Sequence, residues 1–140
     1  MTQPFVLDNS VAMRWCFDEI QNDYAEAVLT LMSNNGKAIV PVLWRYEITS
    51  VLSKAQRIGS ISEDKANGFL DDINTFLITL DYEGIERIMT DVRIIAVTYG
   101  LTGYDAAYLE LAIRKNLPIA TLDDELRKAA QKAGVELLEP

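Results

Sequence analysis

Apolar residues occur along the chain in two patterns. Short apolar runs bounded by proline, glycine or polar residues predict strands at residues 5–7, 38–40, 76–80 and 119–121, and residues 135–138 are a candidate fifth strand. Between these runs, apolar residues recur every three or four positions, which is the spacing of amphipathic helices. The chain is therefore expected to alternate strands and helices.

Glycine, asparagine and capping residues mark the ends of the predicted helices. Ser60 with Glu63 resembles a capping box, and the helix that follows carries its apolar residues to position 73. The predicted helices are residues 10–16, 22–33, 43–58, 60–73, 85–99, 104–115 and 123–133. The helix at 85–99 is expected to bury Ile85, Ile88, Val92, Ile95 and Tyr99.

Strands that are separated by helices pair in parallel through right-handed crossovers. The expected fold is therefore an α/β three-layer sandwich, with a central parallel sheet of four to five short strands flanked by helices. The length of 140 residues suits one domain, residues 1–140. The longest apolar stretch, residues 38–44, is too short for a membrane span, and no basic segment leads into a long apolar one at the start. We expect a cytoplasmic protein without a membrane partner.

The composition excludes several kinds of active site. The sequence contains no histidine, which removes Ser-His-Asp and Cys-His sites and nearly all imidazole zinc sites. Its one cysteine, Cys16, can form neither an internal disulfide nor a thiolate cage, and no glycine-rich nucleotide-binding motif is present. Carboxylates are the remaining groups for catalysis.

Two aspartates fall where a parallel sheet would place a site, and a third lies at the start of a predicted helix. Asp8 follows the first strand directly, and Asp123 follows the strand at 119–121 after one residue. The carboxyl ends of parallel strands meet at one edge of the sheet, where the helices begin. Asp105 lies in the first turn of the helix at 104–115, without an obvious strand before it.

Helix capping is the alternative role for these aspartates. Asp8 suits an N-cap, Thr102 with Asp105 fits a capping box, and Thr121 with Asp124 fits another. The last of these boxes leaves Asp123 without a capping role.

Glu47 cannot be a cap, because it lies in the middle of a predicted helix. It is three residues after Trp44 and four before Val51, on the stripe that should face inward. Arg45 and Lys54 lie on other parts of the helix and give it no local ion pair. A carboxylate there needs a partner or a cation.

Several carboxylates in one place repel each other unless a hard cation neutralises them. An oxygen-only set selects Mg²⁺ or Mn²⁺. Such a cation lowers the pKa of water and neutralises charge that develops on a phosphodiester.

The net charge of −8 opposes general binding to a polyanion, so a nucleic-acid substrate would need a bound cation or a separate basic patch. The candidate basic residues are Arg14, Arg45, Lys54 and Arg57.

Four motifs together resemble those of PIN-domain nucleases, and the nearest pattern is that of single-domain VapC-type toxins. The similarity runs from residue 5 to the end of the chain. The motifs are VLDNS at 6–10, Tyr46-Glu47 in a helix, YDAAYLELA at 104–112 and ATLDDELRKAA at 120–130.

The resemblance implies a metal-dependent endoribonuclease with a parallel sheet flanked by helices. By the same resemblance, Asp8, Asp105 and Asp123 bind Mg²⁺ or Mn²⁺, and Glu47 is a ligand through water or a proton acceptor. Ser10 and Thr121 match positions where the family often has a hydroxyl near the metal.

One position departs from the family pattern. Tyr46 stands where many relatives have asparagine before the helical glutamate. The departure removes a polar contact near the site and leaves the acid itself in place.

The resemblance also implies partners. An RNA substrate, a cognate antitoxin that blocks the cleft, and a homodimer are expected, and the helical hairpin at residues 43–73 is the expected dimer interface.

Three other functions are compatible with parts of the sequence. A haloacid-dehalogenase-type phosphohydrolase would use Asp8 as nucleophile, but Ser10 stands where its second aspartate is required. A phosphoacceptor receiver needs a pair of acids after the first strand, and Asn9 breaks that pair. A catalytically silent PIN fold that only binds a partner is the third.

Overall fold

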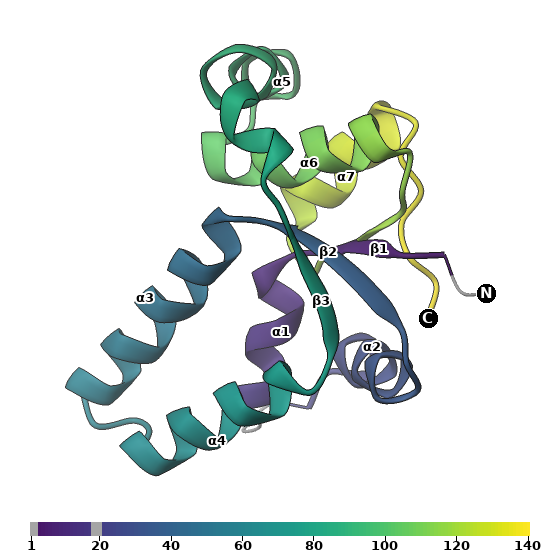
Figure 1. Cartoon of the computed structure of the whole chain (residues 1–140). Helices are drawn as coiled ribbons and strands as arrows, with labels where there is room; N and C mark the ends of the chain where they lie inside the picture. Colours follow the sequence, from purple (N-terminus) through teal and green to yellow (C-terminus); the bar gives the residue numbers. More distant parts are fainter. Residues whose placement is uncertain (1–2, 18–20) are drawn as a thin grey trace.

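The computed structural model describes residues 3–17 and 21–140. Its sheet has four parallel strands in the order β3-β2-β1-β4. The strands are β1 (Phe5–Leu7), β2 (Lys37–Pro41), β3 (Leu77–Asp81) and β4 (Ile119–Ala120). The predicted parallel α/β architecture is confirmed (Figure 1).

Helices occupy most of the remaining described chain. The α-helices are α1 (Asn9–Cys16), α2 (Asp23–Ser33), α3 (Leu43–Arg57), α4 (Glu63–Asn74), α5 (Arg93–Tyr99), α6 (Gly103–Lys115) and α7 (Asp124–Lys132). Two further helical turns, η1 (Glu83–Arg87) and η2 (Ile88–Val92), precede α5. None of the helices in the described part of the chain is both long and apolar enough to cross a membrane.

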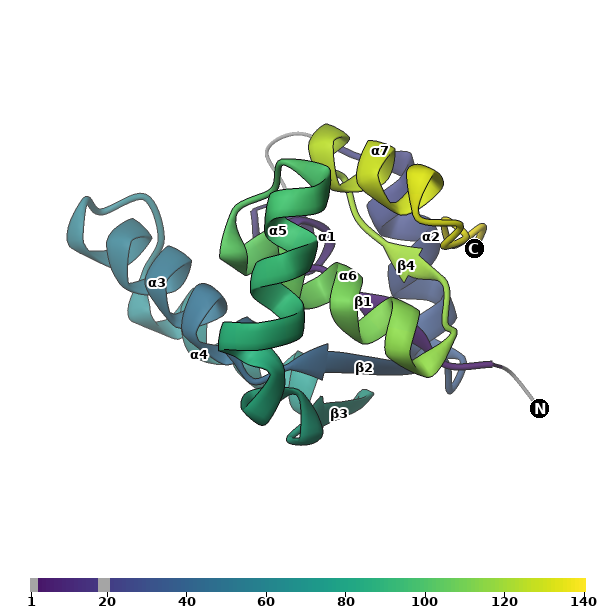
Figure 2. The ribbon, with the colours of Figure 1, turned by 90° about the horizontal axis from the view of Figure 1, so that it is seen from above.

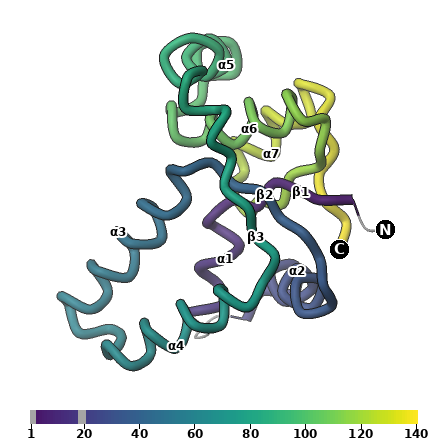
Figure 3. The backbone as a smooth tube through the Cα atoms, viewed as in Figure 1, coloured from purple at the N-terminus to yellow at the C-terminus, as the bar shows by residue number. Residues whose placement is uncertain are grey.

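The helices form one layer on each side of the sheet. Helices α1 to α4 pack together on one face, whereas α6 crosses the other face over β1, β2 and β4, with α5, η2 and α7 against it. Figure 2 shows that the α3–α4 hairpin extends away from the rest of the molecule. The smooth trace in Figure 3 shows the same three layers, with both ends of the chain on the side opposite this hairpin.

The core lies on both faces of the central strand β1. All three of its residues are fully buried, and so are the side chains of α6 that cover them. Burying a large apolar side chain contributes roughly 1.5–3 kcal/mol. The largest fully buried side chains are Tyr108, Phe5, Leu7, Leu109, Leu111, Ile119 and Leu126. This packing fixes β1 and α6, the two elements that carry Asp8 and Asp105.

The prediction of a single long helix at residues 85–99 is wrong. The segment is a 3₁₀ turn, then a π turn, then the short helix α5. Because 3₁₀ and π turns depart from 3.6 residues per turn, the apolar stripe does not stay on one face. Val92 is buried, whereas Ile85 and Ile88 are about half exposed.

Two predicted element boundaries are also wrong. The N-cap of α4 is Ser62, whose hydroxyl accepts from the Lys65 N–H; Ser60 instead donates to the carbonyl of Ala55 at the end of α3. At the C-terminus, the candidate fifth strand is reduced to one parallel bridge between Ile119 and Leu137.

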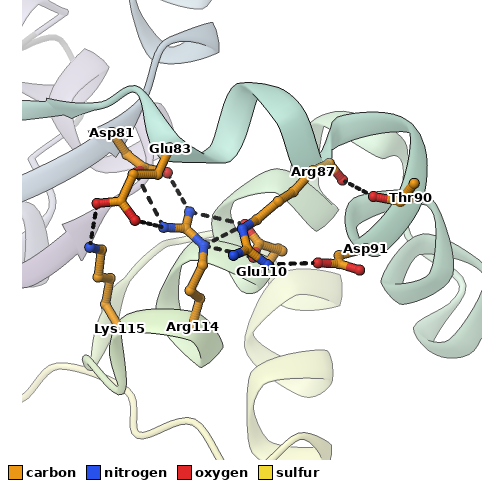
Figure 4. A network of polar contacts seen from close by, with 8 residues as sticks. All are labelled: Asp81, Glu83, Arg87, Thr90, Asp91, Glu110, Arg114 and Lys115. Carbon is orange, nitrogen blue, oxygen red and sulfur yellow. Dashed lines mark hydrogen bonds and ion pairs between the residues drawn. The ribbon is translucent and has the colours of Figure 1, made fainter.

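A buried ionic network joins the end of β3 to α6. The Arg114 guanidinium donates to both Glu110 and Asp81, and the Arg114 Nε to Glu110 Oε2 distance is 2.9 Å (Figure 4). Both carboxylates are at least 94% buried, and Lys115 with Glu83 extends the network to the surface. Removing one partner of such a buried pair typically costs about 3–5 kcal/mol.

Gly84 lets η1 lie directly against this network. A Cβ atom at Gly84 would be 2.5 Å from Asp81 Oδ2 and 3.1 Å from Arg114 Nη2, closer than packed atoms allow. The network therefore sets where the segment after β3 leaves the sheet.

Candidate active site

Two adjacent strands bring Asp8 and Asp123 to the same edge of the sheet. Strand β1 pairs with β4 through Val6 with Ile119 and Leu7 with Ala120. Asp8 follows β1, and its N–H donates to the carbonyl of Ala120 at 3.0 Å. The predicted convergence at the carboxyl edge follows from this register.

Two hydroxyl groups hold the Asp8 carboxylate. Ser10 Oγ and Thr121 Oγ1 both donate to Asp8 Oδ2, at 2.6 and 2.7 Å. The same hydroxyls accept from the backbone: Ser10 from the Leu122 N–H at 3.0 Å, and Thr121 from the Asp123 N–H at 3.0 Å. Since a hydroxyl has one proton to donate, these contacts commit both donors to Asp8. Ser10 and Thr121 therefore position Asp8 and the loop after β4.

Asp123 has a capping role that the sequence did not reveal. Its Oδ1 accepts from the Leu126 N–H at 2.8 Å, so Asp123 is the N-cap of α7. The expected capping box of Thr121 with Asp124 is wrong, because Thr121 is occupied by Asp8 and Asp124 is exposed in the first turn. One oxygen of Asp123 therefore caps the helix, and the charge of the same carboxylate is close enough to Asp8 to raise the Asp8 pKa.

Glu47 has a partner that is distant in sequence. The hydroxyl of Tyr108 donates to Glu47 Oε1 at 2.5 Å, from α6 to α3. Tyr108 is fully buried, whereas Glu47 is partly exposed. The prediction of an inward-facing acid without a local ion pair agrees with this geometry.

Tyr108 was not assigned a role from the sequence. It lies in the 104–112 motif and three residues after Asp105, so the two share one face of α6. That spacing was the available signal. Burial and the Glu47 charge both raise the Tyr108 pKa, which keeps the phenol protonated as a donor.

Asp105 lies in the first turn of α6, and its position is confirmed as helical. Its N–H donates to Thr102 Oγ1 at 3.1 Å, so the predicted Thr102 cap is also confirmed. A side-chain hydrogen bond between Asp105 and Thr102 also lowers the Asp105 pKa.

Charge links the four acids to one another. Burial, together with the charges of Asp8 and Asp105, raises the pKa of Glu47 from an ordinary 4.5 to about 7, and the hydrogen bond from Tyr108 opposes this shift. Burial, then Asp123 and Asp8, raise the pKa of Asp105 to about 6. Burial also raises the Asp8 pKa, and Asp123 adds to it, although Ser10 and Thr121 oppose the shift. Each acid therefore lies within electrostatic reach of at least two others.

The donor set at this edge consists of oxygen atoms, which suits a hard divalent cation. The fit is incomplete in the geometry as it stands: within residues 3–17 and 21–140, no three acidic side chains are close enough to form a metal-binding group. The four acids affect one another's pKa values, but their carboxylates would have to move closer together to bind one cation. Glu47 and Asp105 are only partly buried, so packing does not fully enclose their side chains.

We predict that Glu47→Gln raises the melting temperature in metal-free buffer at about pH 8. The folded-state pKa of Glu47, about 7, lies above the ordinary 4.5, so the proton is held more tightly in the folded protein. Its contribution to stability is therefore full below the ordinary pKa and is lost as pH rises through about 7. The expected rise is about 3 °C, roughly 1 kcal/mol for a chain of this size with solvent screening.

At acidic pH the difference between Glu47→Gln and wild type should vanish. Glu86→Gln is the matched control, since Glu86 is exposed and should leave the melting temperature unchanged at both pH values. A fall in melting temperature for Glu47→Gln at about pH 8 would show that the charge of Glu47 stabilises the fold.

Known proteins share both sequence and fold with this chain. It is 33% identical over 81 residues to Ribonuclease VapC3 of Pyrobaculum aerophilum. That match covers 58% of this chain and 62% of the relative, so it spans less than two thirds of the relative's length.

Solved structures extend the likeness to nearly the whole fold. A protein from Pyrobaculum aerophilum superposes with a TM-score of 0.68 and 25% identity, over 92% of this chain and 87% of the other. VapBC2 from Rickettsia felis, bound to a DNA fragment from its promoter, gives 0.69 at 16% identity, over 97% and 98%. FitAcB from Neisseria gonorrhoeae gives 0.57 at 19%, over 97% of each chain.

The sequence pattern of one family covers almost the entire chain. The PIN domain matches residues 5–132, which includes all four candidate acids and both hydroxyls that hold Asp8. On this match, the chain belongs to the PIN domain family.

Proposed function

We propose that this protein is a metal-dependent endoribonuclease. The observation that carries the proposal is the electrostatic coupling of Asp8, Glu47, Asp105 and Asp123, in which burial and mutual repulsion raise the pKa of three of them. Buried carboxylates that repel one another are destabilising unless a cation binds. The similarity to a protein named Ribonuclease VapC3 supports the same activity.

Each acid has a distinct place in the proposed site. Asp8, Asp105 and Asp123 would hold Mg²⁺ or Mn²⁺, and Glu47 would accept a proton from the attacking water or bind the cation through water. When bound, the cation lowers the pKa of water and neutralises charge on the phosphodiester. Ser10 and Thr121 fix the orientation of Asp8, and Tyr108 fixes that of Glu47.

A proton acceptor with a pKa of about 7 is well matched to this chemistry. A general base works best when its pKa is near the working pH, because it is then both free to accept and strong enough to do so. Glu47 meets that condition through burial, and the Tyr108 hydrogen bond leaves Oε2 for the water.

The nuclease proposal is tested by incubating the protein with unpaired and structured RNA, in Mn²⁺, in Mg²⁺ and in EDTA. We expect cleavage with either cation and none with EDTA. Asp8→Asn and Asp123→Asn should each reduce the rate at least about 100-fold, the usual scale for losing electrostatic stabilisation at a reaction centre.

Asp124→Asn is the matched control for Asp123→Asn. Asparagine caps a helix as well as aspartate does, so Asp123→Asn should fold normally, and the exposed Asp124 should be dispensable for cleavage. Cleavage that persists in EDTA, or in Asp8→Asn, would refute the metal mechanism. No cleavage by the wild-type protein under any condition would favour the catalytically silent PIN fold.

We further propose that the protein is the toxin of a type II toxin–antitoxin pair, with an antitoxin that covers the acidic edge. Three similar proteins support this: the VapC name of the curated relative and the shared fold of VapBC2 and FitAcB. A net charge of −8 and an acid cluster suit a basic inhibitory segment. Homodimerisation through residues 43–73 stays a prediction.

The toxin proposal predicts that expression arrests growth of the host, and that co-expression of the small protein encoded next to it restores growth. The Asp8→Asn variant should not arrest growth. Arrest by that variant equal to wild type, or arrest that no neighbouring gene relieves, would contradict the toxin assignment.

The phosphohydrolase and receiver alternatives have no remaining support. Membership of the PIN domain family accounts for Asp8 and Asp123 without the second aspartate that either alternative needs. Ser10 and Asn9 occupy those positions, and Ser10 instead donates to Asp8.

A further inference from the structure

Two tyrosines next to the acidic edge are unusually exposed. The exposed fractions of Tyr46 and Tyr104 are 73% and 67%. Both line one open hollow of about 1140 Å³, which we call the tyrosine hollow. Large aromatic side chains are normally buried when a protein folds. Two exposed tyrosines that line the same hollow therefore indicate a binding surface.

Each of these tyrosines directly precedes an acid of the proposed site. Tyr46 precedes Glu47 on α3, and Tyr104 precedes Asp105 on α6. Tyr46 lies in the first turn of the predicted dimer hairpin, so the platform requires that a dimer leave this turn open. Consecutive helix residues point about 100° apart, so each ring lies on the same turn as its acid but around the side of the helix. Glu47 and Asp105 are not among the described residues that line the hollow, but each is next in sequence to a tyrosine that does, so the hollow borders the proposed site.

The walls of the tyrosine hollow are largely apolar. They include Val42, Leu43, Val92 and Ala107, and Arg93 adds a cationic side chain. Two acids, Asp81 and Glu110, also line it, but both are bonded to Arg114. The hollow therefore offers flat aromatic and apolar contact with its negative charge compensated.

Binding RNA is difficult for a protein of this charge. Attraction to phosphates, which dominates most nucleic-acid affinity, works against a chain of net charge −8. Stacking of bases on aromatic rings does not depend on net charge and contributes about 1–3 kcal/mol per base. Unpaired bases are free to stack in this way, whereas bases in a duplex are not.

We propose that Tyr46 and Tyr104 form a stacking platform that binds unpaired RNA bases in the tyrosine hollow and presents the adjoining phosphodiester to the acids. This inference rests on the proposed nuclease function and deepens it, because it names the two side chains that would hold the RNA beside the acids. The volume of the tyrosine hollow supports binding of a polymer segment, because it exceeds the roughly 300–1,000 Å³ of common small-molecule sites.

The test is RNA binding measured by fluorescence anisotropy, with a labelled unpaired RNA in EDTA so that the proposed cleavage cannot occur. Tyr46→Ala and Tyr104→Ala should each weaken binding at least about fivefold, the lower limit for one lost stacking contact. Tyr46→Phe and Tyr104→Phe keep the ring and should bind within about twofold of wild type. A duplex of the same sequence should compete poorly.

Tyr82→Ala is the matched control, because Tyr82 is 65% exposed and lies outside the lining of the tyrosine hollow. It should bind RNA as wild type does. An RNA with abasic positions should bind weakly to the wild type and show no further loss with the alanine variants. Melting curves check that every variant is folded.

Two results would overturn the platform. The first is RNA binding by the alanine variants equal to wild type; if these variants also lose self-association in sedimentation, the hollow is a protein interface. The second is an equal loss in the phenylalanine and alanine variants. Cleavage of the same RNA with Mn²⁺ is scored separately: cleavage without ring-dependent binding refutes only the platform, and ring-dependent binding without cleavage refutes only the nuclease activity.

Discussion

The parallel pairing of β1 with β4 is the constraint on which the site depends. Through Val6 with Ile119 and Leu7 with Ala120, it places the first residue after β1 beside the loop after β4. Thr121 can then donate to Asp8, and Ser10 can accept from the backbone of that loop. A shift of one residue in the pairing register would turn these side chains to the other face of the sheet and break the contacts with Asp8.

In the resulting site, packing brings negatively charged side chains together although their charges repel. Packing buries Asp8 and brings Glu47 and Asp105 near it, and the cost appears as raised pKa values for all three. Neutral donors limit that cost without supplying a positive charge: Ser10 and Thr121 donate to Asp8, and Tyr108 donates to Glu47. The basic side chain that a purely structural cluster would contain is found elsewhere: Arg114 neutralises Asp81 and Glu110 at the end of β3. The two acid clusters thus differ in whether the fold itself provides the counter-charge.

The sequence predicted the parts of this structure that depend on local pattern. Strand positions, most helices, the Thr102 cap and the convergence of Asp8 with Asp123 follow from periodicity and from the geometry of parallel sheets. Longer-range partners did not follow, since Tyr108 and Glu47 are 61 residues apart and their contact depends on how α6 packs against α3.

Competing local signals account for the other differences. Ser60 and Ser62 are both good caps, and only the turn at Gly59, with its positive φ of 78°, assigns Ser60 to the end of α3. Thr121 likewise fits a cap by sequence, but the tertiary bond to Asp8 takes its hydroxyl and leaves Asp123 to cap α7. In residues 85–99 the apolar spacing suits a helix, but the ionic network and Gly84 set a different exit from β3.

Calorimetric titration with Mn²⁺ is the sharpest test of whether the four acids form the cation-dependent site that we propose. A cation binds carboxylates in their ionised form, so it must displace the protons that Glu47 and Asp105 hold below their pKa values of about 7 and about 6. Titrations in buffers of different ionisation enthalpy should therefore show proton release near pH 6 that disappears at about pH 8.5. Absence of Mn²⁺ binding, or binding near pH 6 without proton release, would show that these acids do not form a cation site.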